Sequence, residues 1–577
     1  MKRWQRFFWV LVVGLPCFSA LAYVDRYNAY AQPLQWNLTN PPVSVPTNSF
    51  SRSTKAIRFY IGAEAFSTSN TTAEINAIKA ALGQWQAIPN TLIKFEFAGL
   101  LSNITNVNPS DGTNVIFWKK DTSLLNGTTD ISQSLGICFY SYSSNTITEA
   151  DIALNGINKS WFTDITDAAN TNYFVEGVVM HEMGHGLGMA HSPIGGQIMF
   201  PTMGRGIQGQ IRLLSDEIAF ARSFYAATNP AANYGCLTGY VTLAGSGVKG
   251  AIVTVESTNG SVLASTLTWS NGYYAVPLLP PGPAWLRVTP MDGFGLVNPA
   301  MLNEPFFTSS PQTNFYPSTN YSVTLTAGVT NGFNISVTNG APPFRIQYIR
   351  YNYSYGGGAI SVNPGDNNVI VGVMSTNLPT NGAVLQILGD GLTIGPTVIE
   401  PNLAGPLNSI SVTISVATNA TPGVRSLIIL RTNDNVLAHA VGFLQIPPAI
   451  PDQNFDGLND LFQRKYFPVF TDPQAGPNAD PDNDGLNNLQ EYIAGTNPTN
   501  KASVLSVLST TISASGTTIK WQSVAGKKYQ LFSRPGPSPA GNWTPLGTPV
   551  TATNAGAQYF DAGAPTGRKF YRIQVLP

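Results

Sequence analysis

The chain has few charged residues, few cysteines and few histidines for its length. Asp, Glu, Lys and Arg make up only 11% of its 577 residues, and 31 basic residues balance 31 acidic ones. That balance excludes an electrostatic nucleic-acid interface and a polybasic membrane anchor. Three cysteines are too few for a disulfide framework. Gly, Pro and short β-branched runs are abundant instead, which favours several β modules over one large α/β enzyme.

A long apolar run occurs only at the N-terminus. Basic residues among the first six positions precede an apolar stretch at 7–21, and residues 20–22 offer a small-x-small cleavage site. The pattern predicts a secretory signal peptide over residues 1–22. The stretch is short for a membrane span and contains Pro16, and its retention as an anchor is the alternative. We therefore expect a secreted, extracellular protein with no stable membrane anchor once the signal is removed.

Removal of the signal takes away Cys17 and leaves Cys138 and Cys236. Export permits a disulfide between these two residues, and two buried thiols are the alternative. Residues 23–54 follow as an N-terminal extension, and its role as a propeptide stays open.

Three of the four histidines lie within one stretch of eleven residues. On a helix, His181 and His185 are one turn apart. Gly188 permits a positive φ that ends the helix, so the chain can bring His191 to the same ion. Three nitrogen ligands leave the fourth position of a zinc ion open for water, which is typical of a catalytic site. Glu182 lies beside the metal, where it can accept a proton from that water.

The stretch His-Glu-Met-Gly-His-Gly-Leu-Gly-Met-Ala-His at 181–191 resembles the metzincin motif of zinc peptidases. Met199 and Pro201 follow it at the distance of the Met-turn in the matrixin family. The resemblance covers about residues 55–228 and implies one catalytic zinc ion, Glu182 as the general base, and a protein or peptide substrate. It also implies that Met199 packs beneath the metal and that Phe200 and Pro201 wall the S1′ pocket.

The sequence around the motif predicts a mixed α+β domain. Strands are expected at 57–61, 94–97 and 115–118, and a helix in which Thr71 and Glu74 form a capping box. The apolar face of this helix comprises Ile75, Ile78, Leu82 and Trp85.

Further segments resemble the matrixin cleft. Residues 147–155 resemble the strand before the active-site helix, and residues 214–225 resemble the closing helix. Residues 135–142 are expected to form the edge strand that, in the family, pairs with extended substrate. An ordinary half-buried strand is the alternative. The extra histidines of the family's structural zinc are absent, and residues 23–54 lack the cysteine through which a matrixin prodomain blocks the zinc.

Beyond residue 236 the pattern is purely β, apart from the calcium loops. Residues 236–340 resemble a carboxypeptidase-regulatory-like β-sandwich, 341–447 an immunoglobulin-like β-sandwich and 503–577 a small fibronectin-like β domain. Spacers are expected, with polysaccharide or surface binding as the alternative. His439 is expected to be a local structural residue. The predicted fold is multidomain: an α+β metzincin catalytic domain at 55–230, with a mixed twisted sheet plus active-site helix, followed by β-sandwich modules and a calcium-loop segment.

Residues 450–502 contain two candidate calcium loops. Gly485 supplies the bend of the second, whereas Gln463 is a neutral ligand at the twelfth position of the first, so weaker binding is expected there. The segment resembles thrombospondin type 3-like, EF-hand-like repeats of secreted bacterial proteins. A dockerin and a metal-free acidic linker are the alternatives. The expected Ca²⁺ ligands are Asp480, Asp482, Asp484, Leu486, Asn488 and Glu491 in the second loop and Asp452, Asn454, Asp456, Leu458 and Asp460 in the first.

These patterns predict a secreted zinc-dependent endopeptidase that hydrolyses extracellular proteins with a metal-activated water and Glu182 as general base. The alternative is an extracellular adhesin or matrix-binding protein. In that case the β modules and calcium loops dominate, and the peptidase domain is residual or inactive. More than half of the chain lies outside the peptidase region, which is the reason to keep this alternative.

Overall fold

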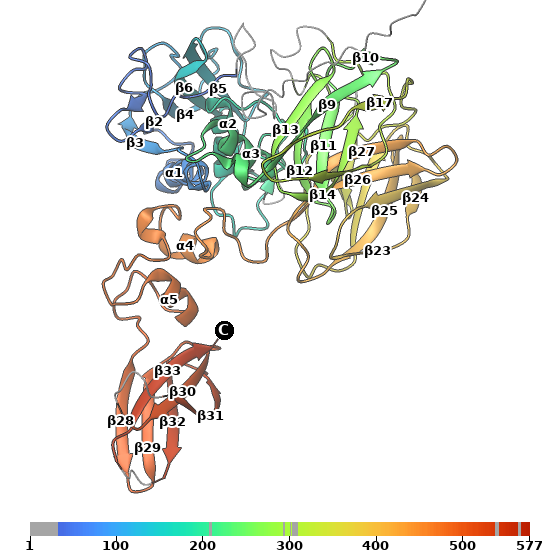
Figure 1. Ribbon diagram of the computed structural model, residues 1–577. Helices are drawn as coiled ribbons and strands as arrows, with labels where there is room; N and C mark the ends of the chain where they lie inside the picture. The colour runs from blue at the N-terminus through green and yellow to red at the C-terminus, as the bar shows by residue number, and fades with distance from the viewer. Residues whose placement is uncertain are drawn as a thin grey trace, which may run out of the picture. The chain divides into compact units, whose positions relative to one another are not determined.

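The computed structural model describes residues 33–206, 210–291, 295–300, 302, 310–536, 542–563 and 567–576. The expected signal peptide, with Cys17, lies outside the described residues. The chain divides into two compact units, residues 1–449 and 450–577 (Figure 1). Within the described ranges, every helix is too short or too polar to span a membrane.

The first unit begins with a mixed β-sheet. Its strands run in the order β1-β2-β4-β6-β5, and β3 pairs with β2 beside this path. Strands β2, β3, β4 and β6 are parallel, whereas β5 pairs with β6 antiparallel at the edge. The mixed sheet predicted from sequence is therefore confirmed. The strands are β1 (Phe50–Ser51), β2 (Ala56–Gly62), β3 (Phe95–Leu101), β4 (Val115–Lys119), β5 (Gly136–Ser143) and β6 (Thr146–Asn155), with a separate parallel pair β7 (Trp161–Phe162) and β8 (Tyr173–Phe174).

Helices α1 (Thr71–Ala87) and α2 (Val175–Gly186) pack together against this sheet, as Figure 1 shows. The predicted apolar face of α1 is buried, and the indole of Trp85 donates a 3.0 Å hydrogen bond to the carbonyl of Met180 in α2. A third helix, α3 (Ser215–Phe224), closes the domain.

The capping box predicted at the start of α1 is wrong. Asn70 occupies the N-cap position, and Thr71 is the first helical residue. The hydroxyl of Thr71 donates to the carbonyl of Ser67, and the carboxylate of Glu74 accepts from the backbone N–H of Ser67 at 3.1 Å. The backbone N–H of Ser67, in the preceding turn, therefore bonds the carboxylate of Glu74 in place of the helix cap.

The described part of the N-terminal extension belongs to this domain. Gln35 pairs with Thr146 at the start of β6, and Leu34, Trp36 and Phe50 are buried. Residues 33–54 therefore contribute to the hydrophobic core.

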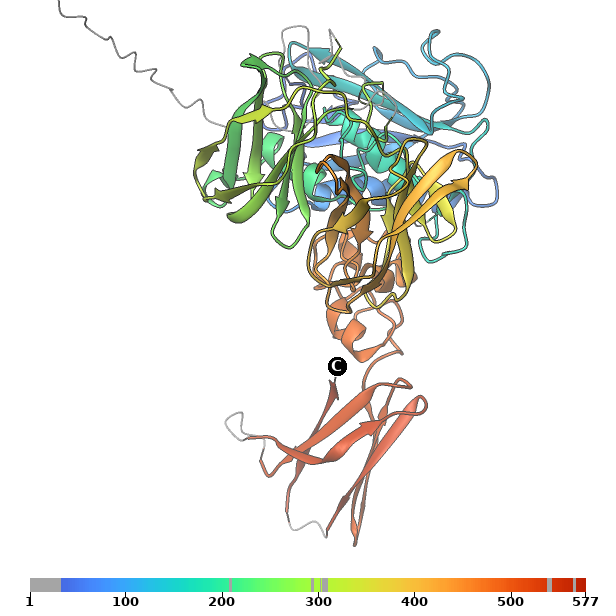
Figure 2. The ribbon, with the colours of Figure 1, turned by 90° about the vertical axis from the view of Figure 1, so that its right-hand side faces the viewer.

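Two β-sandwiches complete the first unit (Figure 2, green and yellow). In each, two sheets enclose apolar side chains, as the sequence predicts. Cys138 on β5 and Cys236 on β9 are both buried. The first sandwich consists of β9 (Gly235–Leu243), β10 (Ser246–Gly247), β13 (Tyr273–Leu279), β16 (Thr330–Gly332) and β17 (Ile335–Val337) facing β11 (Ile252–Ser257), β12 (Val262–Leu267), β14 (Gly282–Thr289) and β15 (Tyr321–Leu325). The second consists of β18 (Tyr348–Tyr351), β19 (Ser354–Gly356), β21 (Val369–Ser375), β23 (Leu392–Ile394), β24 (Val398–Ala404) and β25 (Leu407–Val416) facing β20 (Ile360–Ser361), β22 (Ala383–Ile387), β26 (Gly423–Arg431) and β27 (Leu437–Ile446).

The second unit joins a loop-rich segment to a small sandwich. The loop-rich part has two short helices, α4 (Asp460–Tyr466) and α5 (Asn488–Ala494). Trp521 and Tyr529 form the centre of the sandwich core. Its sheets are β28 (Val507–Ser513), β29 (Gly516–Gln522) and β32 (Gly556–Ala562), and β30 (Lys528–Arg534), β31 (Thr544–Thr551) and β33 (Phe570–Leu576).

Candidate metal centre

The three clustered histidines meet in space. The ring centroids of His181 and His185 on α2 are 4.8 Å apart, and the ring of His191 lies 5.3 Å and 4.8 Å from them. One nitrogen from each ring lies within 4.8 Å of the other two. Gly188 has φ +99°, and a Cβ there would lie 2.0 Å from the carbonyl oxygen of Leu34. Glycine is therefore required both for the turn and for the approach of the N-terminal segment.

Backbone carbonyls orient two of the imidazoles. Nδ1 of His181 lies 2.7 Å from the carbonyl oxygen of Ile198, and Nδ1 of His185 lies 2.9 Å from that of Met189. Because a carbonyl only accepts hydrogen bonds, each Nδ1 carries the proton and Nε2 presents the lone pair to a metal. This tautomer and this set of donors fit Zn²⁺.

The methionine expected beneath the metal is buried against the active-site helix. A Cβ on Gly184 would lie 2.2 Å from the sulfur of Met199, so only glycine at that position of α2 allows the methionine to pack there. The turn is held by Ser192, whose backbone N–H donates to the carbonyl of Met199 at 2.8 Å. Pro201, two residues beyond the methionine, lines the cavity beside the histidines.

Glu182 is buried beside the histidines, facing the edge strand. A Cβ on Gly136, the first residue of β5, would lie 2.8 Å from Oε1 of Glu182. The two residues border a cavity of about 560 Å³. Gly136 is thus a site residue that the sequence reading missed, because no spacing rule links it to the motif. The cavity is lined by the three histidines and by residues of β5, α2 and the loop after Met199, including Leu135, Ile137, Val178, Phe200, Thr202 and Met203.

Two buried carboxylates of α3 hold the loop between His191 and Met199. Asp216 accepts from the hydroxyl of Ser192 at 2.7 Å, and Glu217 accepts from the backbone N–H of Met199 at 3.0 Å. Burial raises the pKa of Asp216 to about 7 and that of Glu217 to about 8, the latter also through the charge of Asp216. The sequence suggested a closing helix here but not this role.

Trp36 and Tyr225 fix the end of the active-site helix. The indole of Trp36 donates to the carbonyl of Gly186 at 2.8 Å, and the hydroxyl of Tyr225 donates to the carbonyl of Leu187 at 2.5 Å. The hydroxyl of Tyr225 also accepts from the backbone N–H of Trp36 at 3.1 Å. These bonds satisfy carbonyls that the end of a helix leaves without intrahelical partners.

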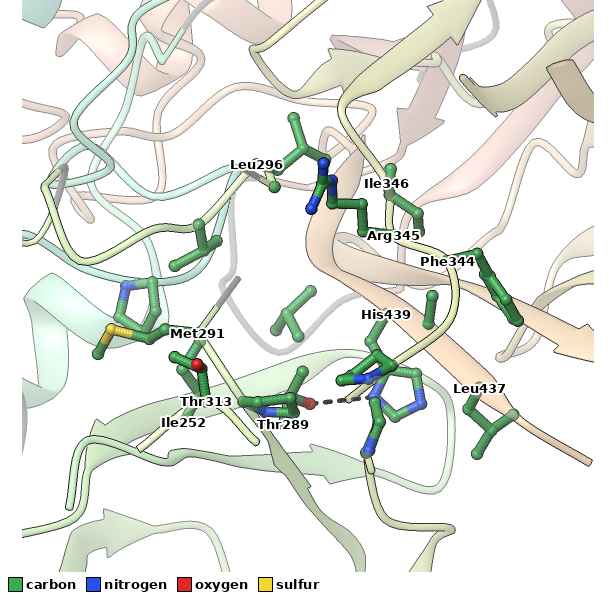
Figure 3. A pocket seen from close by; sticks show the side chains of 18 of the residues that line it. Ile252, Thr289, Met291, Leu296, Thr313, Phe344, Arg345, Ile346, Leu437 and His439 are labelled. Carbon is green, nitrogen blue, oxygen red and sulfur yellow. Dashed lines mark hydrogen bonds between the residues drawn. The ribbon is translucent and has the colours of Figure 1, made fainter. Parts of the chain in front are cut away.

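His439 is structural but not local, which corrects the sequence-based expectation. It lies on β27, and its Nδ1 is 3.1 Å from the hydroxyl of Thr289 on β14, in the other sandwich (Figure 3). Burial lowers the pKa of His439 to about 3, and the charge of Arg287 acts in the same direction. The imidazole is therefore neutral at physiological pH and links the two sandwiches beside a cavity of about 340 Å³.

A second cluster of metal-ligand side chains lies in the loop before α5. Carboxylate oxygens of Asp480, Asp482 and Asp484 lie within 4.8 Å of one another. Buried oxygens of Asp482, Asp484 and Glu491 have no hydrogen-bond partner among the described residues. Burial, followed by the charges of the three aspartates, raises the pKa of Glu491 to about 7. Converging, unsatisfied carboxylate oxygens are the donor set that Ca²⁺ prefers.

The two remaining expected ligands of this loop also bond to neighbouring segments, and the buried Oδ1 of Asn488 has no hydrogen-bond partner among the described residues. The amide nitrogen of Asn488 donates to the carbonyls of Gln474 and Gly476 at 2.9 and 2.8 Å, so this part of the side chain anchors the loop. Gly485 has φ +96°, in keeping with the bend expected there. The backbone N–H of Leu486 donates to Asp484 at 2.8 Å, which tightens the turn.

The first loop is closed by its own amides. Nε2 of Gln463 donates to Asp456 at 2.8 Å and to the carbonyl of Ala475 at 2.9 Å. The side chain of Asn454 donates to Asp456 at 3.0 Å. Asp452 accepts hydrogen bonds from the backbone N–H groups of Asp456 and Gly457. In the second loop, Asp480 accepts from the N–H groups of Asp484 and Gly485 in the same way. Burial raises the pKa of Asp460 to about 7, and this carboxylate accepts from the N–H of Gln453 at 2.7 Å, while Leu458 is buried.

The helix-borne histidine pair, the third histidine after a glycine turn and the methionine packed against the helix define a metzincin-type metal centre. The family model described as Matrixin, of the M10 peptidases, matches residues 51–226. The chain therefore carries a matrixin-family domain over these residues, as the sequence motif predicted.

No curated protein matches the chain. Among solved structures, it is similar to the minor pilin of Streptococcus agalactiae, with 13% identity over 19% of this chain and 47% of the pilin, at a TM-score of 0.14. It is also similar to BcpA, the major pilin subunit of Bacillus cereus, with 14% identity over 36% of this chain and 66% of BcpA, at a TM-score of 0.15. The chain thus spans about half the length of the first pilin and about two thirds of the second. TM-scores this low establish no shared fold.

Proposed function

We propose that the chain is a secreted zinc-dependent endopeptidase that hydrolyses peptide bonds of extracellular proteins. The observation that carries the proposal is the convergence of His181, His185 and His191 within a matrixin domain. Export is supported by the basic and apolar pattern of residues 1–22.

Zinc bound by the three imidazoles would lower the pKa of a bound water and polarise the scissile carbonyl. In this proposal Glu182 is the general base, which takes up a proton at its carboxylate and returns it to the leaving amine. The carboxylate of Glu182 is buried against Gly136, which limits its contact with solvent and holds it beside the first residue of β5. The edge position of β5 supports pairing with an extended substrate backbone, as in β-augmentation.

The decisive test compares Glu182→Gln with the native chain on an unfolded protein substrate, with and without a zinc chelator. We expect kcat/KM to fall by about 10²–10⁴-fold because proton transfer is lost, while zinc content stays the same. Glu176→Gln is the matched control, since Glu176 lies on the same helix, buried and bonded to Gln84. Equal cleavage by the Glu182→Gln variant would refute the assignment.

We further propose that the second loop binds Ca²⁺ through Asp480, Asp482, Asp484, the carbonyl of Leu486, Asn488 and Glu491, and that the first loop binds it more weakly. The unsatisfied carboxylate oxygens of the second loop support this order of affinity. Calorimetric titration of the zinc-loaded Glu182→Gln protein with Ca²⁺ tests it. A single class of equal sites, or no heat at all, would contradict it.

A second candidate function is attachment to an extracellular surface by the second unit. The observation in its favour is the edge strand β28, on which Val507, Leu508 and Ile512 are 55%, 59% and 68% exposed. Large apolar side chains on an edge strand are typical of interaction surfaces. Deletion of residues 450–577 would then abolish binding to cell-surface material and leave peptide cleavage unchanged. Retained binding would exclude this role.

A further inference from the structure

A wall residue of the metal-site cavity belongs to the hydrophobic core of the second sandwich. Phe200 lines the cavity beside the histidines and is only 1% exposed. It also packs within the cluster of buried side chains contributed by β18 to β27. Its ring contacts that of Phe443 on β27 edge to face, with 5.1 Å between centroids.

Hydrogen bonds continue this contact along the loop before Phe200. The backbone N–H of Gly195 donates to the carbonyl of Val441 at 2.9 Å. The side-chain amide of Gln445 donates to the carbonyl of Gly196 at 2.7 Å, and this bond is buried. Strand β27 therefore binds the loop through its main chain and through side chains on both sides of the phenylalanine pair.

The two glycines of the loop leave no space between it and the sandwich. A Cβ on Gly195 would lie 2.5 Å from the ring of Phe443, and a Cβ on Gly196 would lie 2.6 Å from Val424 on β26. Ile194 is buried with Val424, with Val441 and with Val262 of the first sandwich. The loop is thus packed between two modules that lie downstream of the peptidase domain.

Strand β27 is itself fixed on the first sandwich. His439, close to the start of β27, contacts Thr289 of the first sandwich, as Figure 3 shows. Glu256 of β11 forms a buried ion pair with Arg287 at 2.7 Å and accepts a hydrogen bond from Ser426 of β26. Because these groups are buried and paired, a shift of β26 and β27 relative to the first sandwich would leave polar groups unsatisfied.

We propose that the second sandwich is a specificity element of the peptidase, in which Phe443 and Gln445 are positioning residues for loop 194–200. Through Phe200 they set the shape of the cavity on the side that follows the methionine turn. The inference rests on the proposed peptidase function and on the expectation, implied by the matrixin resemblance, that Phe200 walls the pocket for the substrate residue after the scissile bond.

The test measures Phe443→Ala and Phe443→Leu on a peptide library varied at the residue after the scissile bond. Removal of the ring lets Phe200 move into the vacated space, so the preference between large and small residues should shift by roughly tenfold or more, mainly through KM. Gln445→Met, which deletes only the amide, should give a smaller shift in the same direction. Phe443→Leu should restore most of the native preference.

Ile410→Ala is the control for simple loss of stability, because Ile410 is buried in the same sandwich core on β25 of the opposite sheet. It should leave the preference unchanged. Hydrogen exchange provides a readout that does not depend on cleavage: Phe443→Ala should raise exchange at the amide of Gly195, and Ile410→Ala should not. If the native protein binds zinc but cleaves no peptide, the peptidase proposal fails while the exchange comparison still tests the positioning role. An unchanged preference with unchanged exchange, or equal changes in both alanine variants, would overturn the inference.

Discussion

The histidine cluster and the second acidic loop both gather their ligands from a short stretch of chain, but they are oriented in different ways. In the acidic loop, Asp480 accepts hydrogen bonds from the N–H groups of Asp484 and Gly485, so neighbouring residues fix the carboxylate. In the histidine cluster, the nearby carbonyl of Met189 orients His185, but the carbonyl of Ile198 orients His181, and the loop that carries Ile198 is packed against the second sandwich.

This difference shows that the spacing of ligands in the sequence does not by itself determine how the ligands are oriented in the folded site. A loop that orients its own ligands depends on few other residues. A site whose ligands are oriented through packing depends on every module that packs there. We therefore expect the two candidate metal sites to respond independently to metal removal and to mutation.

The strongest challenge to the comparison is selective removal of each metal. A zinc chelator should abolish proteolysis and leave the calcium titration unchanged. Removal of Ca²⁺ should destabilise the second unit and leave initial rates of peptide cleavage unchanged, because the two clusters lie in separate compact units. Rates and thermal unfolding are measured on the same zinc-loaded protein. Loss of cleavage on calcium removal would show that the sites are coupled.

Gly136→Ala tests how far the zinc site depends on close packing. The new Cβ would overlap Oε1 of Glu182 at 2.8 Å, so the carboxylate must move. We expect kcat to fall by about 10–100-fold with little change in zinc content or stability. Gly356→Ala is the matched control, because a Cβ there meets nothing within 4 Å. If the Gly136→Ala variant kept the native kcat, the position assigned to the carboxylate of Glu182, against Gly136, would be contradicted.

A reciprocal exchange tests the local character of the acidic loops. Glu491→Gln should weaken Ca²⁺ binding at the second loop by roughly tenfold or more, because a bidentate carboxylate is lost. Gln463→Glu should strengthen the first loop, since the amide that now bonds Asp456 is replaced by a ligand. Calorimetry on each variant checks the exchange. Equal affinities in both variants and the native chain would mean that the twelfth position does not matter.

The acidic loop should also respond to pH. The folded-state pKa of Glu491, about 7, lies above its ordinary value of 4.5, so the calcium-free folded state holds a proton that the unfolded chain releases. The stability of the calcium-free unit should therefore fall as pH rises from about 4.5 to about 7. Calcium binding, which needs the ionised carboxylate, should strengthen over the same window. Denaturation of the native chain and of Glu491→Gln, with and without Ca²⁺, separates the two effects.

The smallest expected effect concerns the N-terminal segment. Trp36→Phe keeps the ring packed but leaves the carbonyl of Gly186 without its indole donor, at a cost of about 1–2 kcal/mol. Denaturant unfolding measures this loss. A free energy of unfolding equal to that of the native chain would show that water replaces the indole.

Residues close in sequence were predicted well, and contacts between distant residues were not. The meeting of the three histidines and the glycine turn after α2 follow from spacing, and the mixed sheet was expected from the resemblance to metzincins. The cap of α1 was wrong because Ser67 competes for Glu74, and sequence pattern does not rank two donors a few residues apart. His439 was read as local because its partner, Thr289, lies 150 residues away.

The sequence by itself determined which groups can bind metal, since helical and loop geometry places residues of fixed spacing on one side of the chain. Only the tertiary structure decided which nitrogen of His181 bonds a backbone carbonyl, where the carboxylate of Glu182 lies, and what supports Phe200. Those choices depend on contacts such as that of Gln445 with Gly196, 249 residues apart. Packing of this kind leaves no periodic signal, because complementary shape can be supplied by any module that folds against the site.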